Sequence, residues 1–172
     1  WWPVYGRYLA ADSAAGLDPL HEAGAYYIQE PSAMAPVAVL APRPGEKILD
    51  LCAAPGGKST QIADCLQGSG LLVSNEPVPG RAKILSRNME RMGVPNALVV
   101  SARPEKLAPL WVGLFDGVLV DAPCSGEGMF RRHPETREEW TPQSPEGCAS
   151  RQKGILDCAA QMLRPGGRMV YS

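Results

Sequence analysis

Residues 48–60 constrain the fold more than any other stretch, because a short apolar run meets a turn of small residues there. The apolar run predicts a buried strand, the glycine pair predicts a tight turn, and the residues after Gly57 favour a helix. Such a turn presents backbone N–H groups at a helix N-terminus, and small side chains let a ligand approach them closely. The stretch therefore predicts a ligand-binding loop at the carboxyl end of a strand in a parallel sheet.

Three interpretations of this loop are open. Gly57-Lys58-Ser59 looks like the end of a P-loop, but position 52, where that pattern needs glycine, holds cysteine. The dinucleotide fingerprint G-x-G-x-x-G is absent. A purely structural corner between strand and helix is the second interpretation, and a loop for a nucleoside cofactor of the S-adenosylmethionine type is the third.

The composition indicates one globular domain, with 45% hydrophobic and 20% charged residues. The net charge of −1 gives no global signal for nucleic acid, so an RNA site would have to be a local patch. The cysteines at positions 52, 65, 124, 148 and 158 have no C-x-x-C spacing, which disfavours a metal site or a disulfide framework. We expect a cytoplasmic protein without a membrane span.

Apolar segments alternate between the two periodicities. Strands are expected at residues 47–52, 71–76, 97–100, 115–121 and 168–172, and helices at 32–41, 57–66, 79–93 and about 146–163. Ser32 is a candidate cap for the first helix, and residues 164–167 are expected to form a turn before the last strand. This order predicts an α/β fold, a parallel sheet with helices on both faces. Residues 1–30 are expected to be a lead-in segment and 31–172 the domain.

Polar residues follow three of the expected strands, at the edge where parallel strands end together. Glu76 can accept hydrogen bonds from the vicinal hydroxyls of a ribose, although a surface glutamate is the alternative. Asp121 precedes Pro123 and Cys124, and a cysteine in such a turn is accessible as a thiolate. Residues 125–145 then form a long loop with Met129, Phe130, Arg131, Arg132, His133 and Trp140. Arginines among aromatics suit contact with RNA, but the acidic residues there leave a plain solvated loop possible.

Three stretches together, residues 27–34, 50–58 and 121–128, resemble the Nol/Nop/Sun family of RNA cytosine-5 methyltransferases. Residues 163–167 and 170–172 also fit. The run 125–132 is most similar to the bacterial branch that modifies 16S ribosomal RNA. The resemblance implies a class I methyltransferase fold of Rossmann-like type, with S-adenosylmethionine as cofactor and RNA as partner, no metal, and a monomer.

The resemblance also implies roles for individual residues. The cofactor would be held by the loop, by Glu76 on the ribose and by Asp121 between cofactor and cytosine, with Arg81 bracing the pocket. The loop residues concerned are Cys52, Ala53, Ala54, Pro55, Gly56, Gly57 and Lys58. Family members attack carbon 6 of cytosine with a cysteine thiolate, so that carbon 5 can take the methyl group. Asp121 would stabilise that adduct.

The family uses two cysteines, of which Cys124 matches the one that assists release of the product. The nucleophile is expected directly after Ser172, so we expect the chain to be a fragment, truncated after its fifth strand and inactive alone. Cys124 as nucleophile is the alternative within this chemistry. A transfer RNA target, a non-catalytic RNA-binding module and a P-loop nucleotidase are competing interpretations of the function.

Overall fold

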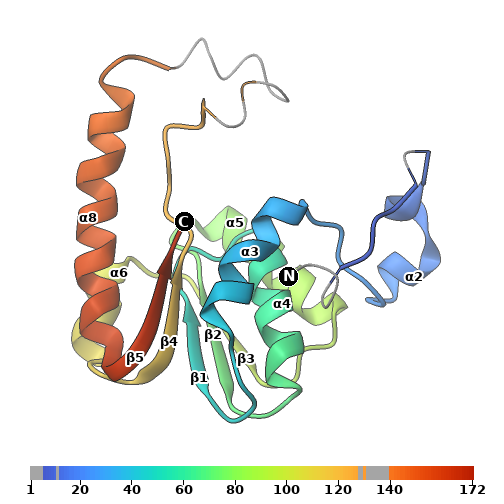
Figure 1. The fold of residues 1–172 in the computed structure, drawn as a ribbon, viewed down its shortest axis with the longest axis horizontal. Helices are drawn as coiled ribbons and strands as arrows, with labels where there is room; N and C mark the ends of the chain where they lie inside the picture. The colour runs from blue at the N-terminus through green and yellow to red at the C-terminus, as the bar shows by residue number, and fades with distance from the viewer. Residues whose placement is uncertain (1–5, 11, 128–129, 131–139) are drawn as a thin grey trace.

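The computed structural model describes residues 6–10, 12–127, 130 and 140–172, and its centre is a parallel sheet (Figure 1). The strands lie in the order β3-β2-β1-β4-β5 and all neighbours pair in parallel. Their bounds are β1 Lys47–Asp50, β2 Leu71–Asn75, β3 Ala97–Val100, β4 Phe115–Val120 and β5 Leu163–Tyr171. Because the first strand lies in the middle, the order of the strands reverses beside β1, where ligands bind in open α/β sheets.

Helices cover both faces of this sheet (Figure 1). The helices are η1 Ala15–Leu17, α2 Pro19–Glu22, α3 Pro31–Leu40, α4 Gly57–Leu66, α5 Pro79–Arg91, α6 Pro104–Leu107, η2 Ala108–Leu110 and α8 Ser144–Met162. Among the described residues, none of these helices is long and apolar enough to cross a membrane. Helices α3, α4 and α5 lie on one face, and α6, η2 and α8 on the other.

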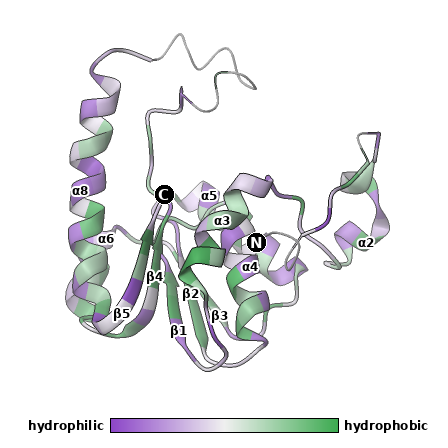
Figure 2. Ribbon diagram, in the orientation of Figure 1, coloured by the Kyte–Doolittle hydropathy of each residue, from purple (hydrophilic) through white to green (hydrophobic). Residues whose placement is uncertain are grey.

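Alternate residues of each strand supply the two cores. Ile48 packs with Leu40 and Ile62 under α3 and α4, whereas the next residue, Leu49, packs with Met162 of α8. The central strands are accordingly mostly apolar along their length (Figure 2). Each fully buried side chain of this size contributes about 1.5–3 kcal/mol to folding. The expected α/β fold with helices on both faces is confirmed.

Most element bounds agree with expectation to within two residues. The helix at 57–66 and the strand at 97–100 match, and the buried stripe of the last helix, Ile155, Ala159 and Met162, is confirmed. Three strands end one or two residues early, so that Cys52, Glu76 and Asp121 lie in the turns beyond them. The expected site residues therefore stand just outside the ladder, where their side chains are not held by the pleat of the sheet.

Two local expectations were wrong. Ser32 does not cap α3, because the helix begins one residue earlier at Pro31 and its N-cap is Glu30. Residues 164–167 are not a turn before the last strand but lie within β5. They form a bulge there, since Leu163 pairs with Phe115 and Arg168 with Gly117. Arg164 fixes the bulge through Asp116, with 2.7 Å between Nε and Oδ1.

Candidate functional site

The loop between β1 and α4 is shaped by its backbone. Gly56 has φ +120°, and a Cβ at this position would lie 3.2 Å from Leu85 Cδ1, so the turn requires glycine. Helix α4 begins at the next residue and has no side-chain cap. Its first N–H groups therefore remain available to a ligand, with the positive end of the helix dipole behind them.

Helix α5 holds this loop and Glu76 together. Arg81 donates from Nη2 to the carbonyl of Ala54 at 3.0 Å, and its Nη1 lies 3.3 Å from Glu76 Oε2. Asn88 donates to the carbonyl of Pro55 at 2.8 Å. Glu76 is only 2% exposed, and its Oε1 accepts the N–H of Val78 at 2.9 Å. The bracing role expected of Arg81 thus corresponds to two contacts, and Glu76 is fixed at the end of β2.

Asn75 was not expected in the site, yet it joins three strand ends. Its Nδ2 donates to the carbonyl of Leu51, and its Oδ1 accepts the N–H of Ala102, both at 3.1 Å. Its own carbonyl accepts the N–H of Ala53 at 2.8 Å. The side chain is fully buried. An amide at the end of an apolar strand, directly before an acidic residue, was the available signal.

Asp121 lies at the end of β4 between two partners. Lys58 Nζ is 2.6 Å from its Oδ2, and Ser172 Oγ donates to its Oδ1 at 3.1 Å. The side chain of Asp121 is 42% exposed, so a ligand at the edge of the sheet can still contact its carboxylate. Two residues that the sequence assigned to the same ligand, Lys58 and Asp121, are therefore in direct contact.

A buried hydrogen-bond network of Asp50, Ser59 and Ser74, which the sequence did not predict, lies next to the loop. Ser59 donates to Asp50 Oδ2 at 2.7 Å and lies 2.8 Å from the hydroxyl of Ser74. Burial raises the pKa of Asp50 to about 7, against the lowering effect of the Ser59 hydrogen bond. Its second oxygen, Oδ1, is buried and has no hydrogen-bond partner among the described residues. The carboxyl is thus close to the boundary between its neutral and charged forms at neutral pH.

The two cysteines of the site differ in their surroundings. Burial, reinforced by the carboxylates of Asp50 and Glu76, raises the pKa of Cys52 to about 12. A raised pKa keeps Cys52 as the neutral thiol, which is a much weaker nucleophile than a thiolate. Cys124 is exposed, in a turn whose Pro123 carbonyl accepts a hydrogen bond from Gln152 of α8 at 2.9 Å. The hydroxyl of Tyr171 in turn donates to Gln152 at 2.8 Å, which connects this turn to β5.

A sequence model of the family described as 16S rRNA methyltransferase RsmB/F matches residues 37–172, which include this whole strand edge. The chain belongs to the RsmB/F family. Its expected place in the bacterial 16S branch of the Nol/Nop/Sun methyltransferases is thereby confirmed. The match begins inside α3, so the N-terminal segment before it lies outside the matched range.

The relatives extend this finding. The chain is 38% identical over 181 residues to ribosomal RNA small subunit methyltransferase F of Escherichia coli O127:H6. It is 40% identical over 176 residues to the protein of the same name from Vibrio vulnificus YJ016. Both alignments cover 99% of this chain and 37% of the relative, so the chain spans little more than a third of the length of these curated relatives.

Solved structures agree in fold. NSun6 from Pyrococcus horikoshii, crystallised with SFG, superposes with a TM-score of 0.80 at 32% identity, over 96% of this chain and 41% of that chain. The O-methyltransferase TomG of Streptomyces achromogenes, solved in complex with SAM, reaches 0.57 at 20% identity, over 84% of this chain and 56% of its own. The second likeness concerns the fold alone, which is that of class I methyltransferases.

The RsmB/F chain continues from Cys124 into the long loop expected to contact RNA. Met129, Arg131, Arg132 and His133 lie outside the described residues. Phe130 and Trp140 are described, with ring centroids 6.4 Å apart at 90°. Trp140 donates to Glu127 at 2.9 Å and Ser125 donates to it at 2.5 Å, and the Ser125 hydrogen bond is the main cause that lowers the pKa of Glu127. Glu127 thus organises the described ends of this loop.

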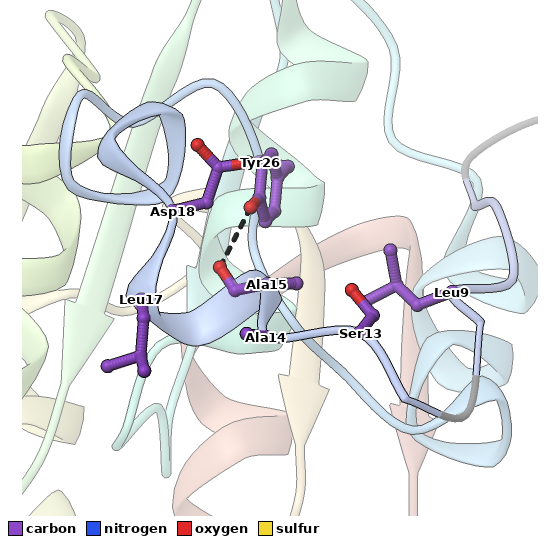
Figure 3. A pocket seen from close by; sticks show the side chains of 7 residues that line it. All are labelled: Leu9, Ser13, Ala14, Ala15, Leu17, Asp18 and Tyr26. Atoms are coloured by element: carbon purple, nitrogen blue, oxygen red, sulfur yellow. Dashed lines mark hydrogen bonds between the residues drawn. The ribbon is translucent and has the colours of Figure 1, made fainter.

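The N-terminal segment of the RsmB/F chain has a hollow of its own (Figure 3). Tyr26 lies across it and donates its hydroxyl proton to the carbonyl of Ala15 at 2.8 Å. The lining residues all lie between Leu9 and Tyr26, and none of the expected site residues is among them. No group of three or more His, Cys, Asp or Glu in the described part of the chain could hold a metal ion.

Proposed function

We propose that this chain carries the cofactor site and part of the catalytic site of an enzyme that methylates carbon 5 of cytosine in 16S ribosomal RNA. With this we propose a cytoplasmic monomer, whose domain at residues 31–172 follows a lead-in at 1–30. The observation that carries the proposal is the meeting of Glu76, the uncapped start of α4 and the Lys58–Asp121 pair at one sheet edge. The names of the Escherichia coli and Vibrio vulnificus relatives support the RNA substrate.

The groups at this edge fit S-adenosylmethionine. Its ribose hydroxyls are donors, which suits the buried carboxylate of Glu76. Its methionine carboxylate suits the free N–H groups of Gly57 and Lys58 at the start of α4. The cofactor supplies an electrophilic methyl group when bound. Arg81 and Asn88 keep the loop from Cys52 to Lys58 in place for it.

We propose roles for Asp121 and Cys124 in the cytosine chemistry. Carbon 5 of cytosine is a weak nucleophile, and addition of a thiolate at carbon 6 makes it electron-rich. We propose that the partly exposed Asp121 hydrogen-bonds the ring at N3 in that adduct. We propose that Cys124 assists its breakdown after methyl transfer, in which carbon 5 loses its proton and the thiolate leaves carbon 6. We propose that the attacking thiolate comes from a second cysteine, as the family resemblance implies. The carbonyl of Ser172 accepts the N–H of Ala122 at 3.1 Å, which brings that end of β5 beside the same turn.

The P-loop interpretation is less well supported. A P-loop lysine must reach a phosphate, whereas Lys58 Nζ lies 2.6 Å from Asp121. A transfer RNA target and a non-catalytic RNA-binding module have no specific observation in their favour.

Calorimetric titration of S-adenosylmethionine into this chain tests the proposal. We expect saturable binding that Glu76→Gln weakens roughly 10- to 100-fold, since a hydrogen bond to a charged group contributes about 1.5–3 kcal/mol. Glu146→Gln, on the exposed start of α8, is the matched control and should leave the affinity unchanged. A chain that is folded by circular dichroism and does not bind the cofactor would contradict the proposal.

A further inference from the structure

A second hollow, of about 640 Å³, lies where the N-terminal segment meets α3 and α4. Its lining includes Tyr26, Tyr27, Gln29, Gly57, Gln61 and Asp64. Gly57 is shared with the cofactor loop, whereas Glu76, Asp121 and Cys124 do not line it. The chemistry proposed above leaves this hollow without a role.

Two glutamines give the hollow its polar character. Gln29 donates its amide to the carbonyl of Ala33, and Gln61 donates its amide to the carbonyl of Met34, both at 3.2 Å. Because both NH₂ groups are directed at α3, the carbonyl oxygens of the two side chains remain as acceptors. The hollow is therefore complementary to a ligand that has N–H donors.

Gln61 makes this requirement specific. The residue is only 8% exposed, and its Oε1 is buried without a hydrogen-bond partner among the described residues. Leaving a buried acceptor unpaired is unfavourable, so a ligand N–H at this atom would be bound preferentially. The carboxylate of Asp64, one helical turn further along α4, also lines the hollow as an acceptor.

An aromatic wall stands beside these acceptors. The ring of Tyr27 lies on Gly57, where a Cβ would be 3.0 Å from Cε1. The guanidinium of Arg91 lies 5.8 Å from the centre of this ring and donates to the carbonyls of His21 and Tyr26. Burial raises the pKa of Tyr27, so the ring is a neutral phenol. A rigid aromatic face beside hydrogen-bond acceptors is the arrangement that recognises a nucleobase.

We propose that this hollow binds a nucleobase with an exocyclic amino group, from a nucleotide of the RNA substrate other than the one methylated. Cytosine, adenine and guanine carry such a group, whose two protons can meet two acceptors such as those of Gln61 and Asp64, whereas uracil offers a single ring N–H. The base stacks on Tyr27 and donates its amino protons to Gln61 Oε1. Arg7 also lines the hollow and carries a positive charge. The inference rests on the proposed function, because that function supplies the RNA.

The test is an NMR titration of the ¹⁵N-labelled chain with cytidine monophosphate and uridine monophosphate. We expect cytidine monophosphate to shift the side-chain amide signals of Gln61 and the backbone signal of Gly57, with at least 5-fold higher affinity than uridine monophosphate. Gln61→Leu should reduce the affinity for cytidine monophosphate to that for uridine monophosphate. Gln161→Leu, at an exposed position of α8, should change neither. If Gln61→Leu does not fold, Gln29→Leu at the half-buried neighbour carries the same test.

Three results would overturn the inference: no response to cytidine monophosphate, equal affinity for the two nucleotides, or a preference that survives in Gln61→Leu. Displacement of cytidine monophosphate by free methionine, which carries no base, would also overturn it and would assign the hollow to the methionine part of the cofactor. The backbone signal of Glu76, followed while S-adenosylmethionine is added to the same labelled chain, reports on the proposed function separately. If S-adenosylmethionine leaves the Glu76 signal unchanged while the preference for cytidine monophosphate is intact, the cofactor site is rejected and the nucleobase site is retained.

Discussion

At the scale of single residues, Asp50 is the least ordinary group of the site. It is fully buried next to the loop from Cys52 to Lys58, with Ser59 as its hydrogen-bond donor. The charge of Lys58 and the backbone of Cys52 lower the pKa of Asp50, and the charge of Asp121 raises it. A carboxyl with a raised pKa costs stability when it is forced to ionise inside the protein. The residue therefore couples the loop to pH.

Ionisation of Asp50 should lower the free energy of unfolding as the pH rises from about 4 to about 7. The unfolded chain releases this proton near pH 3.8, whereas the folded chain keeps it until about pH 7. Asp50→Asn removes the effect, so the difference in stability between wild type and variant should change by at most about 4 kcal/mol over this range. Urea denaturation at pH 4.5 and 7.5 measures it.

The exposed Asp157→Asn on α8 is the control for this experiment and should keep the slope of the wild type. A stability difference between wild type and Asp50→Asn that is the same at both pH values would show that Asp50 ionises normally.

At the scale of elements, the N-terminal segment is attached to the domain through the end of α5. Arg91 donates to the carbonyl of His21, and Gly24 has φ +78° directly against the carbonyl of Arg91. A Cβ on Gly24 would lie 1.9 Å from that oxygen, which is a backbone atom and cannot turn aside. The segment that carries Tyr26 and Tyr27 therefore depends on a glycine at this point.

Gly24→Ala should detach this segment while the sheet remains folded. The left-handed backbone alone costs about 1–2 kcal/mol, and the clash adds to it. We expect faster amide hydrogen exchange at residues 19–27 and loss of the response to cytidine monophosphate, with unchanged binding of S-adenosylmethionine. Gly16→Ala, where the nearest atom is 3.9 Å away, is the control. Unchanged exchange in Gly24→Ala would refute the attachment described here.

The bounds of most elements could be predicted because local chemistry sets them. Helix α4 begins after Gly56 at φ +120° and ends at Leu66, where the left-handed backbone of Gln67 closes it. The start of β5 could not be predicted, since a Pro-Gly-Gly run favours a turn in isolation. Here, pairing with Phe115 and Gly117 keeps both sides of the bulge in the ladder.

The site could be predicted only in part, for a similar reason. Glu76 and Asp121 lie at the expected edge of the sheet because parallel strands end together there, which is a property of the fold. The unpaired carbonyl oxygen of the Gln61 side chain could not be predicted. It is left unpaired because the amide NH₂ of the same side chain donates to Met34, 27 positions away in the chain. No periodicity in the sequence records which atom of an amide is already occupied.

At the scale of the whole molecule, the proposed cofactor site gathers groups that follow β1, β2, β4 and β5, so bound cofactor should stabilise the entire sheet. A ligand at 100 times its dissociation constant contributes about 2.7 kcal/mol. For a chain of this size, that raises the melting temperature by about 5–10 °C. Thermal unfolding with and without S-adenosylmethionine measures the shift. Glu76→Gln should show a much smaller one at the same concentration, and an equal shift in both proteins would place the ligand elsewhere.

The three hydrogen bonds of Asn75 have a consequence for anyone who redesigns this domain. They join the turn at Leu51 and Ala53 to the turn at Ala102, through one buried amide and its backbone. The two turns are therefore not independent modules. A loop grafted after β3 to accept a different cofactor would also shift the loop after β1, unless Asn75 and the N–H at position 102 were both kept. Engineering of cofactor choice has to treat these two loops as one part.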